Sequence, residues 1–202
     1  MMASDDVDKL ASKFEKDVIG WRHHIHQHPE LSNREFETAK YIAAHLRSLG
    51  LKVKTNVAHT GVVAILDSGK PGPVVALRAD IDALPIVETS GVSFASTVKT
   101  TYNGKEVGVM HACGHDGHTA MLLGAAKYLA ETRNFDGSVV VIFQPAEEGG
   151  GGGKEICDDV MMDRWNIQEV YGMHNWPGRE IGTFGIRAGA FFAATDQFDI
   201  TF

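Results

Sequence analysis

Residues 138–143, with the sequence SVVVIF, constrain the fold of this chain more than any other segment. A short, continuous apolar run is typical of a strand that is covered on both faces. Amphipathic helical patterns occupy residues 7–25, 36–49 and 118–132, and further strands are indicated at 61–66, 74–77 and 169–173. Because helix and strand patterns alternate along the chain, we predict an α/β fold.

Some local signals add detail to this fold. Ser32 and Glu35 have the spacing of a capping box at the start of the second helix, which is expected to end at Gly50. The glycine run 149–153 is predicted to be a flexible loop, because it lacks the Gly-Lys-Ser/Thr ending of a phosphate-binding loop. Cys157 is expected to be an ordinary buried thiol.

Polar side chains follow three of the predicted strands. Asp80 and Asp82 come after one strand, Glu147 and Glu148 follow the 138–143 run, and His174 follows the strand at 169–173. In open α/β sheets, ligands bind outside the carboxyl ends of the strands. These side chains are therefore expected to converge at one edge of the sheet.

The segment at residues 110–118, MHACGHDGH, lies just before a predicted helix, whose N-terminal end is expected to face the same edge. Neutral imidazole, thiolate and carboxylate are the ligands that borderline transition metals prefer. Taken singly, each cluster has a simpler explanation: a solvated loop, surface charge, turn chemistry or a hydrogen-bonded core histidine. Their joint occurrence at strand ends instead predicts a metal-dependent hydrolase.

Composition excludes several other classes of protein. The 202 residues, 44% of them hydrophobic, correspond to one domain, or to one domain and the start of another. The net charge of −7 argues against nucleic acid or anionic membrane as a partner. The two cysteines do not suggest a disulfide framework, and no apolar run approaches the ~20 residues of a membrane span. We expect a cytoplasmic protein.

Five segments, in order along the chain, resemble the M20 metallopeptidase family, in its hippurate hydrolase and N-acyl-amino-acid amidohydrolase branch. They are HQHPELS at 26–32, LRADIDALP at 77–85, MHACGHDGH at 110–118, FQPAEEG at 143–149 and GMH at 172–174. The resemblance extends from about Val18 to the last residue. The continuation NWPG at 175–178 favours the hippurate hydrolase type.

This resemblance implies an α/β fold with a mixed, largely parallel sheet flanked by helices. It also implies two divalent metal ions, of zinc, manganese, cobalt or nickel. The implied metal ligands are Cys113, His115, Glu148 and His174. Glu147 is implied to be the catalytic general base, and Asp82 the acidic residue beside the metal site that orients a ligand.

The resemblance leaves two neighbouring side chains without a firm role. Asp80 stands where many M20 relatives carry a ligand histidine, so whether it binds metal is open. His118 lies inside the motif and is expected to support a ligand rather than to bind the metal itself.

The implied activity is hydrolysis of the amide bond of an N-acyl or N-aroyl amino acid, such as hippurate, by a metal-activated water. A dipeptidase or another deacylase of the same family, or a non-catalytic metal-binding fragment, remain alternatives. Residues 1–188 are predicted to be the N-terminal part of the catalytic domain. Residues 189–202, with a strand-like stretch at 198–202, are predicted to begin an incomplete lid or dimerisation domain. We therefore expect this chain alone to be inactive or nearly so, and the full-length form to be a homodimer or tetramer.

Overall fold

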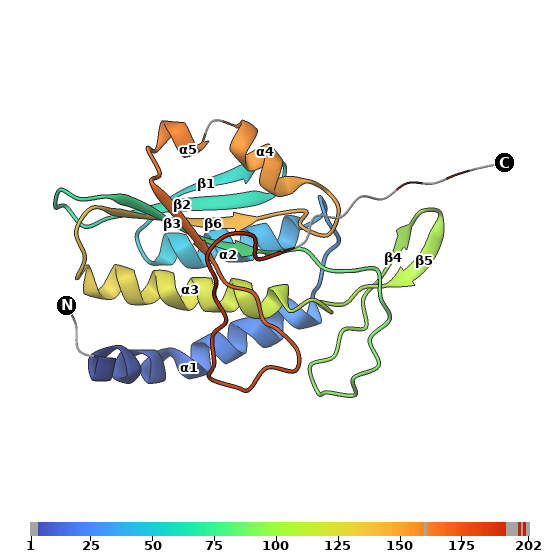
Figure 1. The fold of residues 1–202 in the computed structure, drawn as a ribbon. Helices are drawn as coiled ribbons and strands as arrows, with labels where there is room; N and C mark the ends of the chain where they lie inside the picture. The colour runs from blue at the N-terminus through green and yellow to red at the C-terminus, as the bar shows by residue number, and fades with distance from the viewer. Residues whose placement is uncertain (1–3, 160, 193–197, 199, 201–202) are drawn as a thin grey trace.

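A computed structural model describes residues 4–159, 161–192, 198 and 200. A five-stranded sheet with the strand order β1-β2-β6-β3-β7 forms its centre, and β4 and β5 form a separate hairpin (Figure 1). The strands are β1 (Lys52–Val57), β2 (Gly61–Asp67), β3 (Val74–Asp80), β4 (Lys99–Tyr102), β5 (Lys105–Gly108), β6 (Ser138–Gln144) and β7 (Glu169–Gly172). The helices are α1 (Ser4–Gln27), α2 (Phe36–Ser48), α3 (His115–Thr132), α4 (Gly152–Asp158) and α5 (Met161–Arg164).

The sheet is mixed, and most of its strands run in one direction. β3 pairs in parallel with both β6 and β7, whereas β2 is antiparallel to both β1 and β6. Within this sheet, therefore, β2 runs opposite to the other four strands. The predicted α/β fold with a mixed, largely parallel sheet is confirmed.

Helices cover both faces of the sheet, and the side chains of β6 explain why. Val141 and Phe143 belong to the cluster that packs under α2 and α3, while Val140 and Ile142 contact the opposite cluster, which includes Ile156 of α4. Successive residues of a strand point to opposite faces, so an uninterrupted apolar run fills two cores at once. Figure 1 shows α2 and α3 on one side of the sheet and α4 and α5 on the other, with α1 packed outside α3.

The strongly patterned elements lie where the sequence predicts them, with shifted ends. α3 begins at His115 rather than at His118, and β3 continues to Asp80. The sequence analysis missed β1, the β4–β5 hairpin, α4 and α5, which are short and largely polar. In the part of the chain that the structure describes, no helix has the length and apolar character needed to cross a membrane.

The predicted capping box at the start of α2 is wrong. Glu35 is the N-cap residue of α2 but makes no capping hydrogen bond with its side chain, which is buried. Its carboxyl instead accepts hydrogen bonds from Thr60 Oγ1 and from the backbone N–H of Ala146. Ser32 Oγ donates to Asp82 Oδ2 at 2.6 Å. Both side chains therefore make tertiary contacts and do not cap the start of α2. At its other end, α2 stops before Gly50, whose φ is +76°.

Two further local predictions need correction. Cys157 is exposed on α4 rather than buried. The glycine run is a loop only in its first part, because α4 begins at Gly152. A Cβ atom at Gly152 would lie 1.9 Å from the carbonyl oxygen of Pro145, so this position needs glycine for close backbone packing.

The domain boundary between residues 188 and 189 stays a prediction. The strand expected at 198–202 falls mostly outside the described residues, of which only Phe198 and Ile200 belong to that stretch; both are exposed.

The double-sided packing of β6 predicts a large stability effect at Phe143, whose side chain is fully buried. Phe143→Ala should lower the free energy of unfolding by about 3–5 kcal/mol, because it removes apolar contacts and leaves a cavity. Urea denaturation measures this change. Phe36→Ala is the matched control, since Phe36 is 59% exposed and its loss should change stability by no more than about 0.5 kcal/mol. Equal losses in the two variants would contradict the assigned core.

Candidate metal centre

The carboxyl ends of β3, β6 and β7 meet the start of α3 at one edge of the sheet. The parallel register of β3 and β6 sets Asp80 opposite Gln144, so the segments that follow these strands leave the sheet side by side. The backbone N–H of Glu148 donates to Asp82 Oδ2 at 2.9 Å. Cys113 Sγ lies 3.4 Å from His174 Nε2. The structure thus brings together the polar clusters that the sequence analysis expected to converge.

One group of candidate ligands consists of Cys113, His115 and Glu148. One ligand atom from each lies within 4.8 Å of those of the other two. His115 is fully buried, and the Glu148 side chain is 20% exposed. Thiolate, imidazole and carboxylate together make a donor set that suits zinc and neighbouring transition metals.

His115 is held so that one ring nitrogen faces this group. Its Nδ1 lies 2.9 Å from the backbone oxygen of Asp82 and 3.3 Å from Asp82 Oδ1, so it serves as the donor. In the neutral ring, which is the form that binds a metal, Nε2 then carries the lone pair and lies 3.8 Å from Glu148 Oε1. Among the described residues, neither of these two buried atoms has a hydrogen-bond partner. A buried acceptor without a partner costs about 1–3 kcal/mol, and a cation between the two atoms would remove that cost.

A second group consists of Asp80, His115, His118 and His174, which also bring ligand atoms within 4.8 Å of one another. His118 Nδ1 lies 2.7 Å from Asp80 Oδ1, and His118 Nε2 lies 2.6 Å from Asn175 Oδ1. Both ring nitrogens of His118 are therefore engaged by protein atoms. This arrangement is compatible with a supporting role for His118, which stays a prediction.

The ring of His174, like that of His115, has Nδ1 hydrogen-bonded to a backbone oxygen and Nε2 facing other candidate ligands. Its Nδ1 donates to the carbonyl oxygen of Asn175 at 2.7 Å, which leaves Nε2 facing Cys113. Histidines that bind metals commonly donate their other ring N–H to a carbonyl or carboxylate in this way. The four residues predicted to be ligands are therefore close together, and each histidine has one ring nitrogen hydrogen-bonded to the protein and the other facing the group; their role as ligands stays a prediction.

The charges of the site act on one another strongly. Burial alone would favour the neutral acid at Asp80, but the hydrogen bond from His118 and the charges of His115 and Arg78 lower its pKa to about 2. Burial also opposes the charged form of His115, yet its hydrogen bond to Asp82 and the nearby carboxylates raise its pKa. Burial, followed by the charge of Glu148, raises the pKa of Cys113 to about 12. Nearby carboxylates contribute to the raised pKa of both His115 and Cys113, and a divalent cation would balance the negative charge of these carboxylates.

Glu147 and Glu148 differ in their surroundings. Glu147 Oε2 lies 3.8 Å from His115 Nε2, and its side chain is 40% exposed, twice the fraction found for Glu148. Burial raises the pKa of Glu148. Glu148 thus lies deeper among the candidate ligands, while Glu147 is open to a bound molecule.

The sequence analysis did not assign a site role to Ser32, Gly114 or Asn175. Gly114 precedes α3 with φ +86°, and a Cβ atom there would lie 2.5 Å from Asn175 Oδ1. Ser32 donates to Asp82. The glycine at position 114, within the segment 110–118, was a sequence signal that another group approaches the backbone closely there. The contacts of Ser32 and Asn175 depend on the fold and have no such signal in the sequence.

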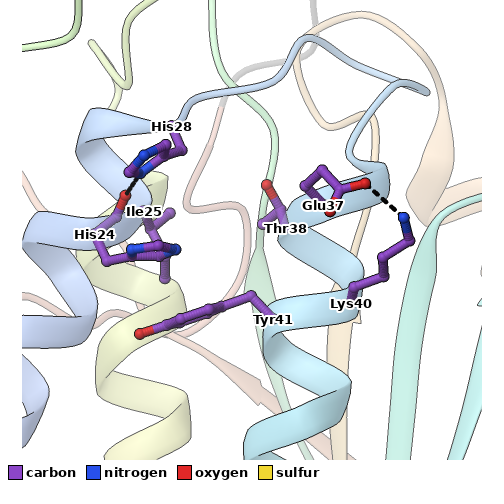
Figure 2. Close-up of a pocket in the computed structure, with 7 residues that line it drawn as sticks. All are labelled: His24, Ile25, His28, Glu37, Thr38, Lys40 and Tyr41. Carbon is purple, nitrogen blue, oxygen red and sulfur yellow. Dashed lines mark hydrogen bonds and ion pairs between the residues drawn. The ribbon is translucent and has the colours of Figure 1, made fainter.

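A separate cavity of about 450 Å³ lies between α1 and α2 and is shown in Figure 2. Tyr41 stacks on His24, and His28 Nδ1 donates to the carbonyl oxygen of His24. None of the seven residues that line this cavity is a candidate ligand, so it is distinct from the metal centre.

Comparison with known proteins places this fold and cluster in one family. The chain belongs to Peptidase family M20/M25/M40, whose family model matches residues 76–201. It is 45% identical over 190 residues to N-acetyl-L-cysteine deacetylase of Bacillus subtilis (strain 168), covering 94% of this chain and 43% of that protein. It is 43% identical over 201 residues to N-acyl-L-amino acid amidohydrolase of Geobacillus stearothermophilus, with 98% and 52% covered.

A solved structure agrees with the family assignment. The YXEP protein of Bacillus subtilis, described as a dinuclear metal binding peptidase of the M20 family, superimposes with a TM-score of 0.79 at 39% identity. The match covers 87% of this chain and 47% of that one. The chain thus spans about half the length of the curated relatives it matches. The predicted family is confirmed.

The cysteine in the cluster allows a direct test of metal binding. We expect the chain to bind Co²⁺ with the absorption band of a thiolate ligand, and Cys113→Ser to abolish that band and weaken binding by more than about tenfold. Cobalt titration followed by absorption measures both effects. Cys157→Ser is the matched control, because Cys157 is exposed on α4. A Cys113→Ser variant that binds like the wild type would rule out the thiol as a ligand.

Proposed function

We propose that this chain carries the metal centre of an amidohydrolase that cleaves the amide bond of N-acyl amino acids. The observation that carries the proposal is the cluster of Cys113, His115 and Glu148, with Glu147 beside it, in a chain of the M20 family. Within the part of the chain that the structure describes, His115 Nε2 and Glu148 Oε1 have no hydrogen-bond partner, which supports a role of the cluster in binding cations.

In this proposal Cys113, His115, Glu148 and His174 hold two divalent ions, of zinc, manganese, cobalt or nickel. Such ions, when bound, supply a water of lowered pKa and polarise the carbonyl of the scissile amide. The description of a relative as dinuclear supports the number of ions.

The protein side chains then divide the remaining work. Glu147, the more exposed of the two glutamates, takes the proton from the attacking water and returns it to the departing amine. Asp82 accepts a hydrogen bond from His115 Nδ1–H, through its backbone oxygen and Oδ1, and so keeps Nε2 free for the metal. The greater burial of Glu148 and the contact of its N–H with Asp82 support its role as a ligand.

The names of the relatives support the substrate class. N-acetyl-L-cysteine deacetylase and N-acyl-L-amino acid amidohydrolase both act on an acylated amino acid according to their names. We propose a small N-acyl amino acid as the substrate, with hippurate as one member of the class. A panel of N-acetyl amino acids, hippurate and dipeptides distinguishes this activity from a dipeptidase or from another deacylase.

The relatives are about twice as long as this chain. We propose that residues 1–188 belong to the catalytic domain and 189–202 to the start of a lid domain, and that the 202-residue chain alone turns over substrate slowly or not at all. The whole enzyme is proposed to be a homodimer or tetramer.

The proposed role of Glu147 as general base leads to a specific prediction for turnover. Glu147→Gln should lower turnover by about 10²–10⁴-fold, because the amide cannot accept the proton, while the metal content stays the same. Turnover is measured on N-acetyl amino acids with the chain alone, and with the chain extended by the unmatched part of the Geobacillus stearothermophilus relative. Unchanged turnover of the extended variant would refute the general-base role, and loss of metal would instead indicate a ligand role.

A further inference from the structure

We propose that Glu35 is a positioning residue, whose buried carboxyl holds the backbone at Ala146 and thereby sets the directions of Glu147 and Glu148. This inference rests on the proposed function and deepens it, because it adds a residue that positions the two glutamates of the site. Glu35 itself is not one of the candidate ligands. Its evidence is geometric and comes from three segments that are distant in the sequence.

Both carboxyl oxygens of Glu35 are used. Oε2 accepts the hydroxyl hydrogen of Thr60 at 2.5 Å, and Oε1 accepts the backbone N–H of Ala146 at 2.9 Å. The side chain is fully buried. Its own backbone is fixed at the start of α2, where the carbonyl oxygen of Glu35 accepts the N–H of Ala39. Thr60 directly precedes β2. The carboxyl is therefore held on two regular elements and presented to the loop after β6.

Ala146 needs such support. Its φ is +52°, in the left-handed region that residues other than glycine seldom adopt, and it is fully buried. Strained backbone of this kind persists when the surrounding structure fixes it, and it is concentrated at functional sites. The turn at Ala146 directs the chain from the end of β6 into the two glutamates.

Two buried carboxyls accept the backbone N–H groups of the residues directly before and after Glu147. Glu35 accepts the N–H of Ala146, and Asp82 accepts the N–H of Glu148. The residues on both sides of Glu147 are therefore held through their backbone N–H groups, while the side chain of Glu147 remains 40% exposed. Because catalytic groups must be held to within a fraction of an ångström, loss of either hydrogen bond should disturb the site.

The chemistry of Glu35 allows a matched pair of variants. Burial raises its pKa, which favours the neutral acid. In Glu35→Gln the amide oxygen can still accept from Ala146, and the amide NH₂ can donate to the Thr60 hydroxyl, which accepts as well as donates. Glu35→Met keeps a similar length without an acceptor. Glutamine should therefore restore what methionine removes.

The first measurement is amide hydrogen exchange of the 202-residue chain without metal. Glu35→Met should speed exchange at Ala146 roughly tenfold, which corresponds to the loss of one buried hydrogen bond, while Glu35→Gln remains like the wild type. The amide of Val141, within β6, is the internal control. If Glu35→Met does not fold, Glu35→Asp replaces it, because the shorter side chain keeps the carboxyl but withdraws it from Ala146.

The second measurement is Co²⁺ affinity of the same variants. The acceptor-less variant should bind Co²⁺ about 10–100-fold more weakly than the wild type, and Glu35→Gln should match the wild type. Lower thermal stability with unchanged exchange or unchanged Co²⁺ affinity would overturn the positioning role, as would failure of glutamine to restore both. If the wild-type chain binds no Co²⁺, the proposed function fails, and the exchange comparison alone then decides whether Glu35 holds Ala146.

Discussion

The buried carboxylate of Asp82 is the contact on which the rest of the site depends. Its Oδ2 accepts hydrogen bonds from Ser32 Oγ and from the backbone N–H of Glu148, and its Oδ1 and backbone oxygen face His115 Nδ1. Burial by itself would raise its pKa, but the hydrogen bonds from His115, Ser32 and the backbone at Glu148 outweigh burial and lower it. An ionised Asp82 thus ties three other segments to the end of β3 and fixes which nitrogen of His115 is free.

Around this carboxylate, strands and a helix place the segments of the site, and short turns orient the side chains that these segments carry. The parallel pairing of β3 with β6 places their carboxyl ends side by side, and α3 begins at the same edge. Two residues with positive φ, Gly114 and Ala146, then turn the chain so that the side chains that follow face inward. The result concentrates thiol, imidazole and carboxylate groups in a partly buried cluster, in which His115 Nε2 and Glu148 Oε1 have no hydrogen-bond partner among the described residues.

Much of this arrangement could be predicted from the sequence, because the signals were local or periodic. The apolar run at 138–143 required two covered faces, and the polar residues after each strand required a shared edge. The capping-box error shows the limit of such signals. Ser32 and Glu35 have the right spacing for a helix start, yet their partners Asp82 and Ala146 lie 50 and 111 residues away. Where a buried acceptor can satisfy a distant backbone N–H, that tertiary contact outweighs a local cap that solvent can replace.

In the proposed site, one sulfur and several nitrogen or oxygen atoms from distant segments bind a common metal. X-ray absorption at the zinc edge of the Zn²⁺-loaded chain tests it directly. We predict a zinc–sulfur distance of about 2.3 Å, from Cys113, and lighter neighbours at about 2.0–2.2 Å, including imidazole scattering from His115 and His174. A spectrum with only light-atom neighbours and no sulfur, at full zinc occupancy, would show that the cluster does not assemble as described.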